Sequence, residues 1–213
     1  MRSCFLWTVG ALLILLVTAG LAYAYLIKPW YYRWGATDAE ISAALPGDEL
    51  VAKPKILRTK AITIAAPIEL VWPWLVQMGQ DKAGLYSYEW IENLLGSDIH
   101  NADRIVPEWQ DLQPGDLMRL YPVEKSGPAP YIIAQVEPPR ALVMGHQDDT
   151  GNWVESWQFY LVPVDMATTR LVHRDRSQGQ GGIWDALDFA YFIMERAMLL
   201  GIQQRAEAQA QGE

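Results

Sequence analysis

The chain has 213 residues, of which 51 % are hydrophobic and 20 % are charged, and its net charge is −8. This length suits one main domain with an appendage, and the composition excludes a disordered acidic chain, a collagen-like chain and a coiled coil. A single cysteine, Cys4, excludes a disulfide scaffold or a cysteine-built metal site within one chain. Ten Trp and ten Tyr against four Phe favour amphipathic rings, which suit membrane interfaces and ligand pockets.

Charge is unevenly distributed along the chain. Residues 1–60 contain seven Lys or Arg against four Asp or Glu, whereas residues 61–213 contain ten basic and 21 acidic residues. An acidic main domain repels phosphate backbones, so we expect no nucleic-acid partner. The basic stretch at residues 53–60 is interpreted as a solvated linker, and contact with anionic lipid is the alternative.

An uncharged segment near the start of the chain predicts a transmembrane helix. Residues 5–27 are 23 residues without a charged side chain, and about 20 are needed to cross a hydrocarbon core. Arg2 precedes this segment and Lys28 follows it. The next aromatic residues form an expected belt at headgroup level: Trp30, Tyr31, Tyr32 and Trp34.

A cleaved signal peptide is the alternative to an anchor. Ala22-Tyr23-Ala24 has the small-x-small form of a cleavage site, which would remove residues 1–24. We favour a single-pass anchor in a plasma or inner membrane, because the apolar run continues beyond Ala24. Lys28 and Arg33 slightly outweigh Arg2, which favours the cytoplasmic side for the main domain.

A short helix and a linker are expected between the anchor and the main domain. Thr37 and Glu40 have the spacing of a capping box, and Pro46 follows the apolar residues that the helix would contain. These features divide the chain into four parts. The parts are an anchor with its belt (1–35), a short helix and linker (36–55), the main domain (56–208) and a tail (209–213).

The main domain opens with one strand and two short helices. Alternating apolar residues predict a strand over residues 56–65. Pro67 suits the first position of an amphipathic helix, which Pro73 should kink. A second helix is expected over residues 88–95, with Ser87 as its N-cap.

Five extended segments and one long helix complete the chain. The predicted strands cover residues 117–121, 131–136, 141–146, 154–162 and 169–176. Short connections between consecutive strands indicate an antiparallel meander, and therefore an α+β domain. Helical spacing of apolar residues predicts a helix from Ile183 to about Ala208, whose charged residues mark it as a packing helix rather than a second span.

Several motifs resemble the START-like helix-grip superfamily, SRPBCC, which includes polyketide cyclases and lipid-transport domains. These are ITIAAP leading into Val71-Trp72, VEPPRAL at 136–142, WQFYL at 157–161 and TRL at 169–171. The segments WLVQMGQDKAGLYSYEWIENLLG and IVPEWQDLQPGD resemble an SRPBCC subgroup in which several members have an N-terminal membrane segment. Over roughly residues 56–206, the resemblance implies a curved antiparallel sheet around the last helix, with an internal cavity for an apolar ligand. It implies no particular reaction.

Common reaction motifs are missing from the sequence. It contains no GxSxG elbow, no HExxH pair and no phosphate-binding GxxxxGK[ST] loop. Residues 179–182 are glycine-rich and precede a predicted helix, which we interpret as a turn rather than an anion site. The three histidines are dispersed, so a metal site would have to be assembled from distant segments, and no metal and no cofactor is expected.

A polar segment around His100 contains the catalytic candidates. Histidine is the side chain suited to proton transfer at physiological pH, so His100 would serve as a general base if Asp103 oriented it, and Glu89 and Tyr88 are further acid or base candidates. The alternative, which we favour, is a loop held by Asx turns with a surface His–Asp pair.

Nine residues are ligand-binding candidates, chosen because they border the implied cavity or carry polar groups on apolar elements. Glu89 and Asn93 share a helix face, and Trp157 shares a strand face with other apolar residues. Arg174 is paired with an acid or a ligand if it is buried, but an outer solvated stripe is the more ordinary reading. The candidates are Trp72, Gln77, Tyr86, Tyr88, Glu89, Asn93, Trp109, Trp157 and Arg174.

The leading hypothesis is a membrane-anchored START-like domain that binds a small apolar or lipid-like molecule in an internal cavity. The alternative is a cyclase- or hydrolase-type enzyme that acts on a hydrophobic substrate there. A protein-interaction domain without an open cavity is the second alternative. The sequence leaves open the identity of the ligand, binding against catalysis, and the oligomeric state.

Overall fold

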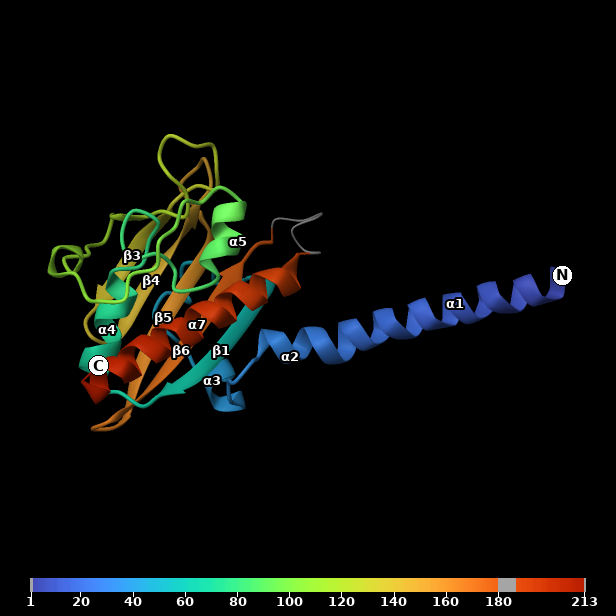
Figure 1. The fold of residues 1–213 in the computed structure, drawn as a ribbon, viewed down its shortest axis with the longest axis horizontal. Helices are drawn as coiled ribbons and strands as arrows, with labels where there is room; N and C mark the ends of the chain where they lie inside the picture. Colours follow the sequence, from blue (N-terminus) through green and yellow to red (C-terminus); the bar gives the residue numbers. More distant parts are fainter. Residues whose placement is uncertain (1, 180–186, 213) are drawn as a thin grey trace.

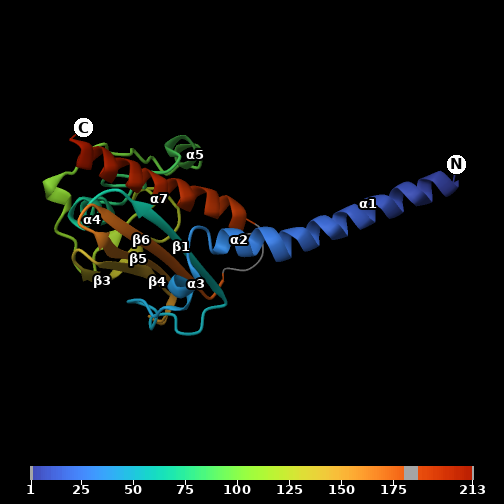
Figure 2. The same ribbon diagram turned by 90° about the horizontal axis from the view of Figure 1, so that it is seen from below.

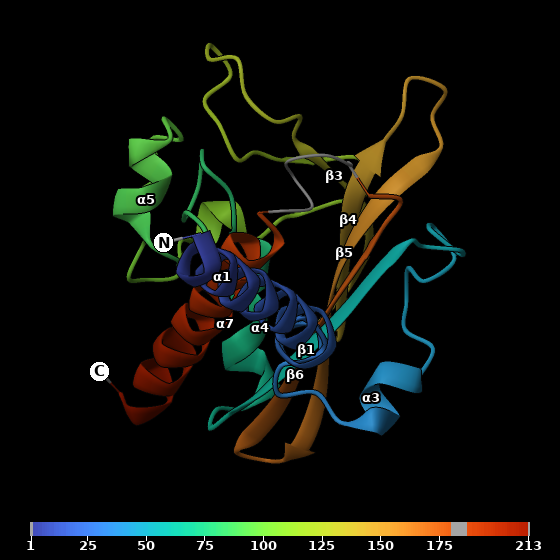
Figure 3. The same cartoon turned by 90° about the vertical axis from the view of Figure 1, so that its right-hand side faces the viewer.

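The computed structural model describes residues 2–179 and 187–212. A long N-terminal helix projects from one end of a domain in which a second long helix packs against one face of a single sheet (Figure 1). Seen along the projecting helix, the sheet lies to one side and the helices α5 (Glu89–Leu94) and α7 (Asp188–Gln211) to the other (Figure 3). The expected start of the last helix at residues 183–186 and most of the glycine-rich turn lie outside the described residues.

The sheet has six strands in the order β1-β6-β5-β4-β3-β2, and every neighbouring pair is antiparallel. Their bounds are β1 (Ile56–Ile64), β2 (Leu117–Met118), β3 (Tyr131–Glu137), β4 (Ala141–Gln147), β5 (Trp153–Asp165) and β6 (Thr168–Ser177). The expected meander is confirmed for the last five strands. β2 is shorter than expected, and β1 pairs with β6 at the far edge.

One face of the sheet wraps around helix α7 (Asp188–Gln211), which crosses it obliquely (Figure 2). Register shifts in β3, at the end of β4 and near the end of β5 accompany the curvature, because an extra residue on one strand bends the ladder. This is the α+β helix-grip arrangement that the sequence motifs indicated.

We call the space between the curved sheet and α7 the grip. The apolar core fills the half of the grip that faces the C-terminal part of α7. Ile64 on β1 and Phe159 and Leu161 on β5 lie at alternating positions, so they share the face that meets the helix. Leu199 and Ile202 of α7 pack against them and are fully buried. Burying each such side chain contributes about 1.5–3 kcal/mol to folding.

Two short helices and a 3₁₀ turn flank the grip: α4 (Ile68–Val76), α5 (Glu89–Leu94) and η2 (Pro107–Trp109). Pro67 caps α4 instead of occupying its first turn. The expectation that Ser87 caps α5 is wrong, because Tyr88 holds the N-cap position without a side-chain bond. The Ser87 hydroxyl instead donates to the buried carboxylate of Glu92.

The N-terminal helix is continuous through α1 (Arg2–Ala22), a π-helical turn η1 (Tyr23–Ile27) and α2 (Lys28–Tyr32). Its segment Val9–Tyr32 has 24 residues and is long and apolar enough to cross a membrane. No second helix in the described part of the chain meets that criterion.

Aromatic residues at the end of this long helix dock it onto the domain. Tyr31 is fully buried, and its ring lies 5.4 Å from those of Phe189 and Phe192 on α7. The expectation of a ring at headgroup level is therefore wrong for Tyr31, because α7 offers it an apolar partner. Trp30 remains 56 % exposed.

The short helix α3 (Asp38–Ser42) has the expected capping box between Thr37 and Glu40. It ends earlier than the apolar residues suggested. Together with the segment that follows, it covers the outer face of β6, where three arginines pair with it. The pairs are Arg170 with Glu40, and Arg174 and Arg176 with Asp48. The stripe expected to be solvated is therefore largely covered.

A close approach between α7 and the chain before α5 gives a test of this packing. A Cβ atom at Gly201 would overlap the backbone carbonyl oxygen of Tyr86. We expect Gly201→Ala to destabilise the domain by about 1–3 kcal/mol in a urea titration, because rigid backbone must move apart. At an exposed helical glycine, substitution by alanine increases stability instead. An unchanged or increased stability of Gly201→Ala would therefore contradict the packing described here.

Candidate functional site

Charged side chains occupy the concave face of the sheet at its wide end. Pairing across β1, β6 and β5 places Arg58, Asp175 and Trp157 in one row. The next row contains Lys60, His173 and Phe159. All six are buried, which is unusual for Lys, Arg and Asp unless they are paired.

Helix α7 closes this region from above. Asp188, Tyr191 and Glu195 recur at helical spacing and lie on the face turned toward the sheet, where Asp188 and Glu195 are almost fully buried. We call the resulting group of side chains the polar cluster. Its members are Arg58, Lys60, Tyr131, Glu155, Trp157, His173, Asp175, Asp188, Tyr191 and Glu195.

Glu195 is the centre of one half of the polar cluster. Its carboxylate pairs with the Lys60 ammonium group and lies 3.0 Å from Nε2 of His173. Nδ1 of His173 is 3.2 Å from the carbonyl oxygen of Gln158. Both ring nitrogens thus face acceptors, and a neutral ring can satisfy only one of them.

Arg58 is the centre of the other half. Its guanidinium group donates to Asp175 across 2.6 Å and also to Asp188. Asp188 in turn accepts hydrogen bonds from the hydroxyl groups of Tyr31 and Tyr32, at 3.2 and 2.5 Å. The last residues of the long apolar helix therefore connect through Asp188 to the interior of the domain.

The cluster contains more acids than cations, and this governs its protonation. Burial raises the pKa of Asp175 to about 7, with Glu155 and Glu195 adding repulsion and Arg58 opposing it. Burial also disfavours charge on Glu195, but Lys60 and His173 outweigh it and lower its pKa to about 2. Burial lowers the pKa of His173, and the Glu195 carboxylate opposes that shift. Asp175 is therefore a carboxyl group of the cluster whose pKa lies near neutral pH.

An aromatic wall borders the cluster on the side of β3 and β4. The Tyr131 ring stacks on Trp157 at 4.9 Å and on His146 at 4.0 Å, and its hydroxyl donates to Glu155. Tyr191 closes the wall from α7, with its ring 6.2 Å from that of Trp157.

Four polar atoms of the cluster are buried without a hydrogen-bond partner among the described residues. They are Nε of Arg58, Oδ1 of Asp175, Nε1 of Trp157 and the hydroxyl of Tyr191. Leaving one buried polar group unsatisfied costs about 1–3 kcal/mol, so four in one place point to a missing partner. The unpaired atoms belong to side chains in mutual contact, since Arg58 also lies over the Tyr191 ring.

Only Trp157 among the ligand-binding candidates lies in the polar cluster. Gln77 and Asn93 form hydrogen bonds with loop backbone. The Gln77 side chain donates to the carbonyl of Arg104 and accepts from the amide of Val106. The Asn93 side chain donates to the carbonyl of Ile99 and accepts from its amide. Their side chains hold the loop in place.

Three aromatic candidates pack into the core or its edge. Tyr86 is buried, and its hydroxyl donates to the carbonyl of Trp74. Trp72 and Trp109 are partly buried and pack against the apolar core. Arg174 lies on the outer face of β6, where it donates to Asp48 and to backbone carbonyls of Glu40 and Ile41.

The three catalytic candidates gather on the surface beside α5. His100 has a side chain 77 % exposed, with Nδ1 3.5 Å from the Glu89 carboxylate. That carboxylate also accepts the backbone amide of Asn101, and Tyr88 is 40 % exposed. None of the three belongs to the polar cluster.

The sequence contained a signal for the polar cluster. Counting by two from buried Leu171 reaches His173 and Asp175, and helical spacing aligns Asp188 with Glu195. Charged residues at core positions of two elements indicate a buried polar site. In the described part of the chain, no group of three His, Cys, Asp or Glu side chains has the geometry to hold a metal ion.

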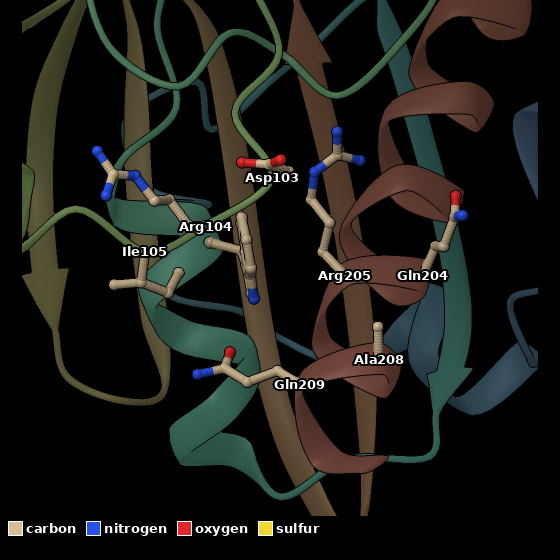
Figure 4. Close-up of a pocket in the computed structure, with 8 residues that line it drawn as sticks. Asp103, Arg104, Ile105, Gln204, Arg205, Ala208 and Gln209 are labelled. Carbon is tan, nitrogen blue, oxygen red and sulfur yellow. The ribbon is translucent and has the colours of Figure 1, made fainter. Parts of the chain in front are cut away.

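A separate surface pocket of about 400 Å³ lies between α4, the loop at 103–105 and the end of α7. Arg205 and Asp103 lie at the same end of it, whereas Arg104 extends away (Figure 4). Arg205 already donates to the carbonyls of Ala102 and Gly201. The pocket lies beside the opposite end of α7 from the polar cluster.

No protein-family model and no curated protein matches this chain. Solved structures similar to it include protein NE0264 from Nitrosomonas europaea, with 15 % identity and a TM-score of 0.49 over 78 % of this chain and 99 % of that chain. The self-sacrificing resistance protein CalC from Micromonospora echinospora shares 12 % identity, with a TM-score of 0.47 over 74 % and 97 %.

The Polyketide_cyc-like protein Cgl2372 from Corynebacterium glutamicum shares 17 % identity, with a TM-score of 0.35 over 72 % of this chain and 88 % of that chain. Identities this low concern the fold alone. Because all three TM-scores are below 0.5, the helix-grip assignment rests on the strand order and on the position of α7.

The Lys60–Glu195 pair gives a first test of the cluster. Lys60→Met leaves the Glu195 carboxylate buried without its cation, which should cost about 3–5 kcal/mol of unfolding free energy in urea titrations. The double variant Lys60→Met/Glu195→Gln removes both charges and should recover part of that loss. A Lys60→Met variant as stable as the parent would contradict a buried ion pair.

Asp175 predicts a specific pH dependence. The pKa of Asp175 is about 7 in the folded chain, whereas its ordinary value, which we take for the unfolded chain, is 3.8. At a pH between these two values, the folded state binds a proton that the unfolded state lacks. The stability that this provides is complete below about pH 4 and is lost as pH rises through 7. The unfolding free energy of the parent minus that of Asp175→Asn should therefore fall across this window. A difference that is constant with pH would show that Asp175 is ionised throughout.

Proposed function

We propose that this chain is a membrane-anchored helix-grip domain that binds a small molecule with an apolar body and an oxygen-bearing polar group. The observation that carries the proposal is the set of four unpaired polar atoms inside the grip. A ligand that supplied their partners would recover the free energy that burial costs them.

The chemistry of these atoms describes the polar group of the ligand. Nε of Arg58 and Nε1 of Trp157 are donors, and the Tyr191 hydroxyl can donate or accept. Asp175 Oδ1 accepts when ionised and donates when protonated. Carboxyl, carbonyl or hydroxyl oxygens meet these needs, and the aromatic wall and apolar core suit a hydrocarbon or ring body.

The anchor would hold the domain beside the bilayer, where such a ligand partitions. Val9–Tyr32 provides the span, and its end is tied to Asp188 through Tyr31 and Tyr32. The balance of Lys28 and Arg33 against Arg2 favours the domain on the cytoplasmic side of a plasma or inner membrane.

A cyclase- or hydrolase-type activity is the second candidate. It is favoured by Asp175, a buried carboxyl group whose pKa lies near neutral pH, as general acid–base catalysis requires. The reacting group would then lie against Asp175 and not against the surface set of His100, Glu89 and Tyr88.

The proposal is tested on the full chain purified in detergent. Native mass spectrometry should detect a copurified small molecule, and titration with the fluorescent fatty acid 11-(dansylamino)undecanoic acid should saturate. Tyr191→Phe removes only the unpaired hydroxyl, so it should weaken probe binding about two- to tenfold, as expected for one lost hydrogen bond.

Tyr160→Phe is the matched control, because its hydroxyl lies on the outer face of β5 and accepts from Arg140. It should leave probe affinity unchanged, and Tyr191→Phe should unfold at the same urea concentration as the parent. A chain that carries no small molecule and binds no probe would overturn the proposal and favour a protein-interaction domain.

A further inference from the structure

The end of the domain that carries the anchor has an exposed apolar surface. On α5, Trp90 is 70 % exposed and Leu94 is 77 % exposed, and Leu95 beside them is also exposed. Leu187 at the N-cap of α7 is exposed as well, and so are Phe189 and Ile193 on its first turns. We call these six residues the apolar end.

The exposure follows from how the two helices are oriented. α5 directs its polar residues inward, where Glu92 is buried and Asn93 bonds the backbone of Ile99, so its apolar residues face outward. α7 likewise turns Asp188 and Glu195 into the polar cluster. α5 is therefore inverted relative to an ordinary surface helix, which buries its apolar side, whereas the first turns of α7 bury Phe192 together with their acidic residues and leave Phe189 and Ile193 exposed.

The α7 part of the apolar end adjoins the place where the long apolar helix leaves the domain. α5 and the start of α7 lie at the end from which α1 projects (Figure 1). The Phe189 ring is 5.4 Å from that of Tyr31, and the exposed ring of Trp30 lies one residue earlier on the same helix. The span and the apolar surface thus meet at α2.

We propose that the apolar end lies in the headgroup region of the bilayer that holds the anchor, so that the domain rests on the membrane through α5 and α7. The proposal rests on the membrane anchor of the proposed function. Trp90 and Trp30 have the amphipathic rings that this region favours, and leucine and phenylalanine side chains would reach the acyl boundary.

This placement gives the polar cluster a short path to lipid. Asp188 and Tyr191 of the cluster lie within the same turns of α7 as Leu187 and Phe189. A ligand that leaves the bilayer beside α7 would meet the polar cluster without crossing bulk water.

The test labels the full chain in lipid vesicles with an environment-sensitive NBD fluorophore at single cysteines. Cys4→Ser removes the native thiol, and Leu94→Cys, Leu187→Cys, Met166→Cys or Leu13→Cys supplies the labelling site. Met166 is the control, because it is 95 % exposed in the turn between β5 and β6, at the opposite end of the domain (Figure 1). Leu13 reports the span itself.

Spin-labelled lipid should quench the fluorophore several-fold more strongly at positions 94 and 187 than at 166, and aqueous iodide should show the reverse order. Equal lipid quenching at 94, 187 and 166 would overturn the proposal. Shielding of position 94 from both quenchers would also overturn it, because a protein surface then covers α5. Strong lipid quenching at Leu13→Cys would support the membrane anchor whatever the result at positions 94 and 187. Weak lipid quenching at Leu13→Cys would contradict the anchor itself.

Discussion

The position of α7 on the sheet depends on charged side chains that are buried between the two elements and neutralise one another there. Lys60 with Glu195, and Arg58 with Asp175 and Asp188, join β1, β6 and α7 across the wide end of the grip. A buried pair adds little net stability, but breaking one is costly, so these contacts specify how the helix lies on the sheet. The apolar core at the other end supplies the stability.

The same charges connect three parts of the molecule that differ in chemistry. Asp188 accepts from Arg58 inside the grip and from Tyr31 and Tyr32 at the end of the span. This one carboxylate therefore links the Arg58 guanidinium group to the helix that ends at Tyr32. The polar cluster, the end of the long apolar helix and part of the apolar end thus meet at the first turns of α7.

Local patterns in the sequence were sufficient for much of the fold. Residues 5–27 gave an uninterrupted apolar run, Thr37 and Glu40 a capping box, and the later strands an alternating pattern with short turns. The N-cap of α5 was wrong because Ser87 is drawn to Glu92, a contact that no local rule contains. The solvated arginine stripe was wrong because covering it depends on where residues 38–52 fold back.

By itself, the sequence determined the apolar span, the α+β class and the order of elements, since these depend on the spacing of neighbouring residues. Only the tertiary structure decided which of two faces each strand turns inward, and hence that His173 and Asp175, not Arg174, enter the grip. It also decided that Tyr31 packs on α7. Both outcomes depend on partners more than 100 residues away in the chain, such as Arg58 for Asp175 and Asp188 for Tyr31.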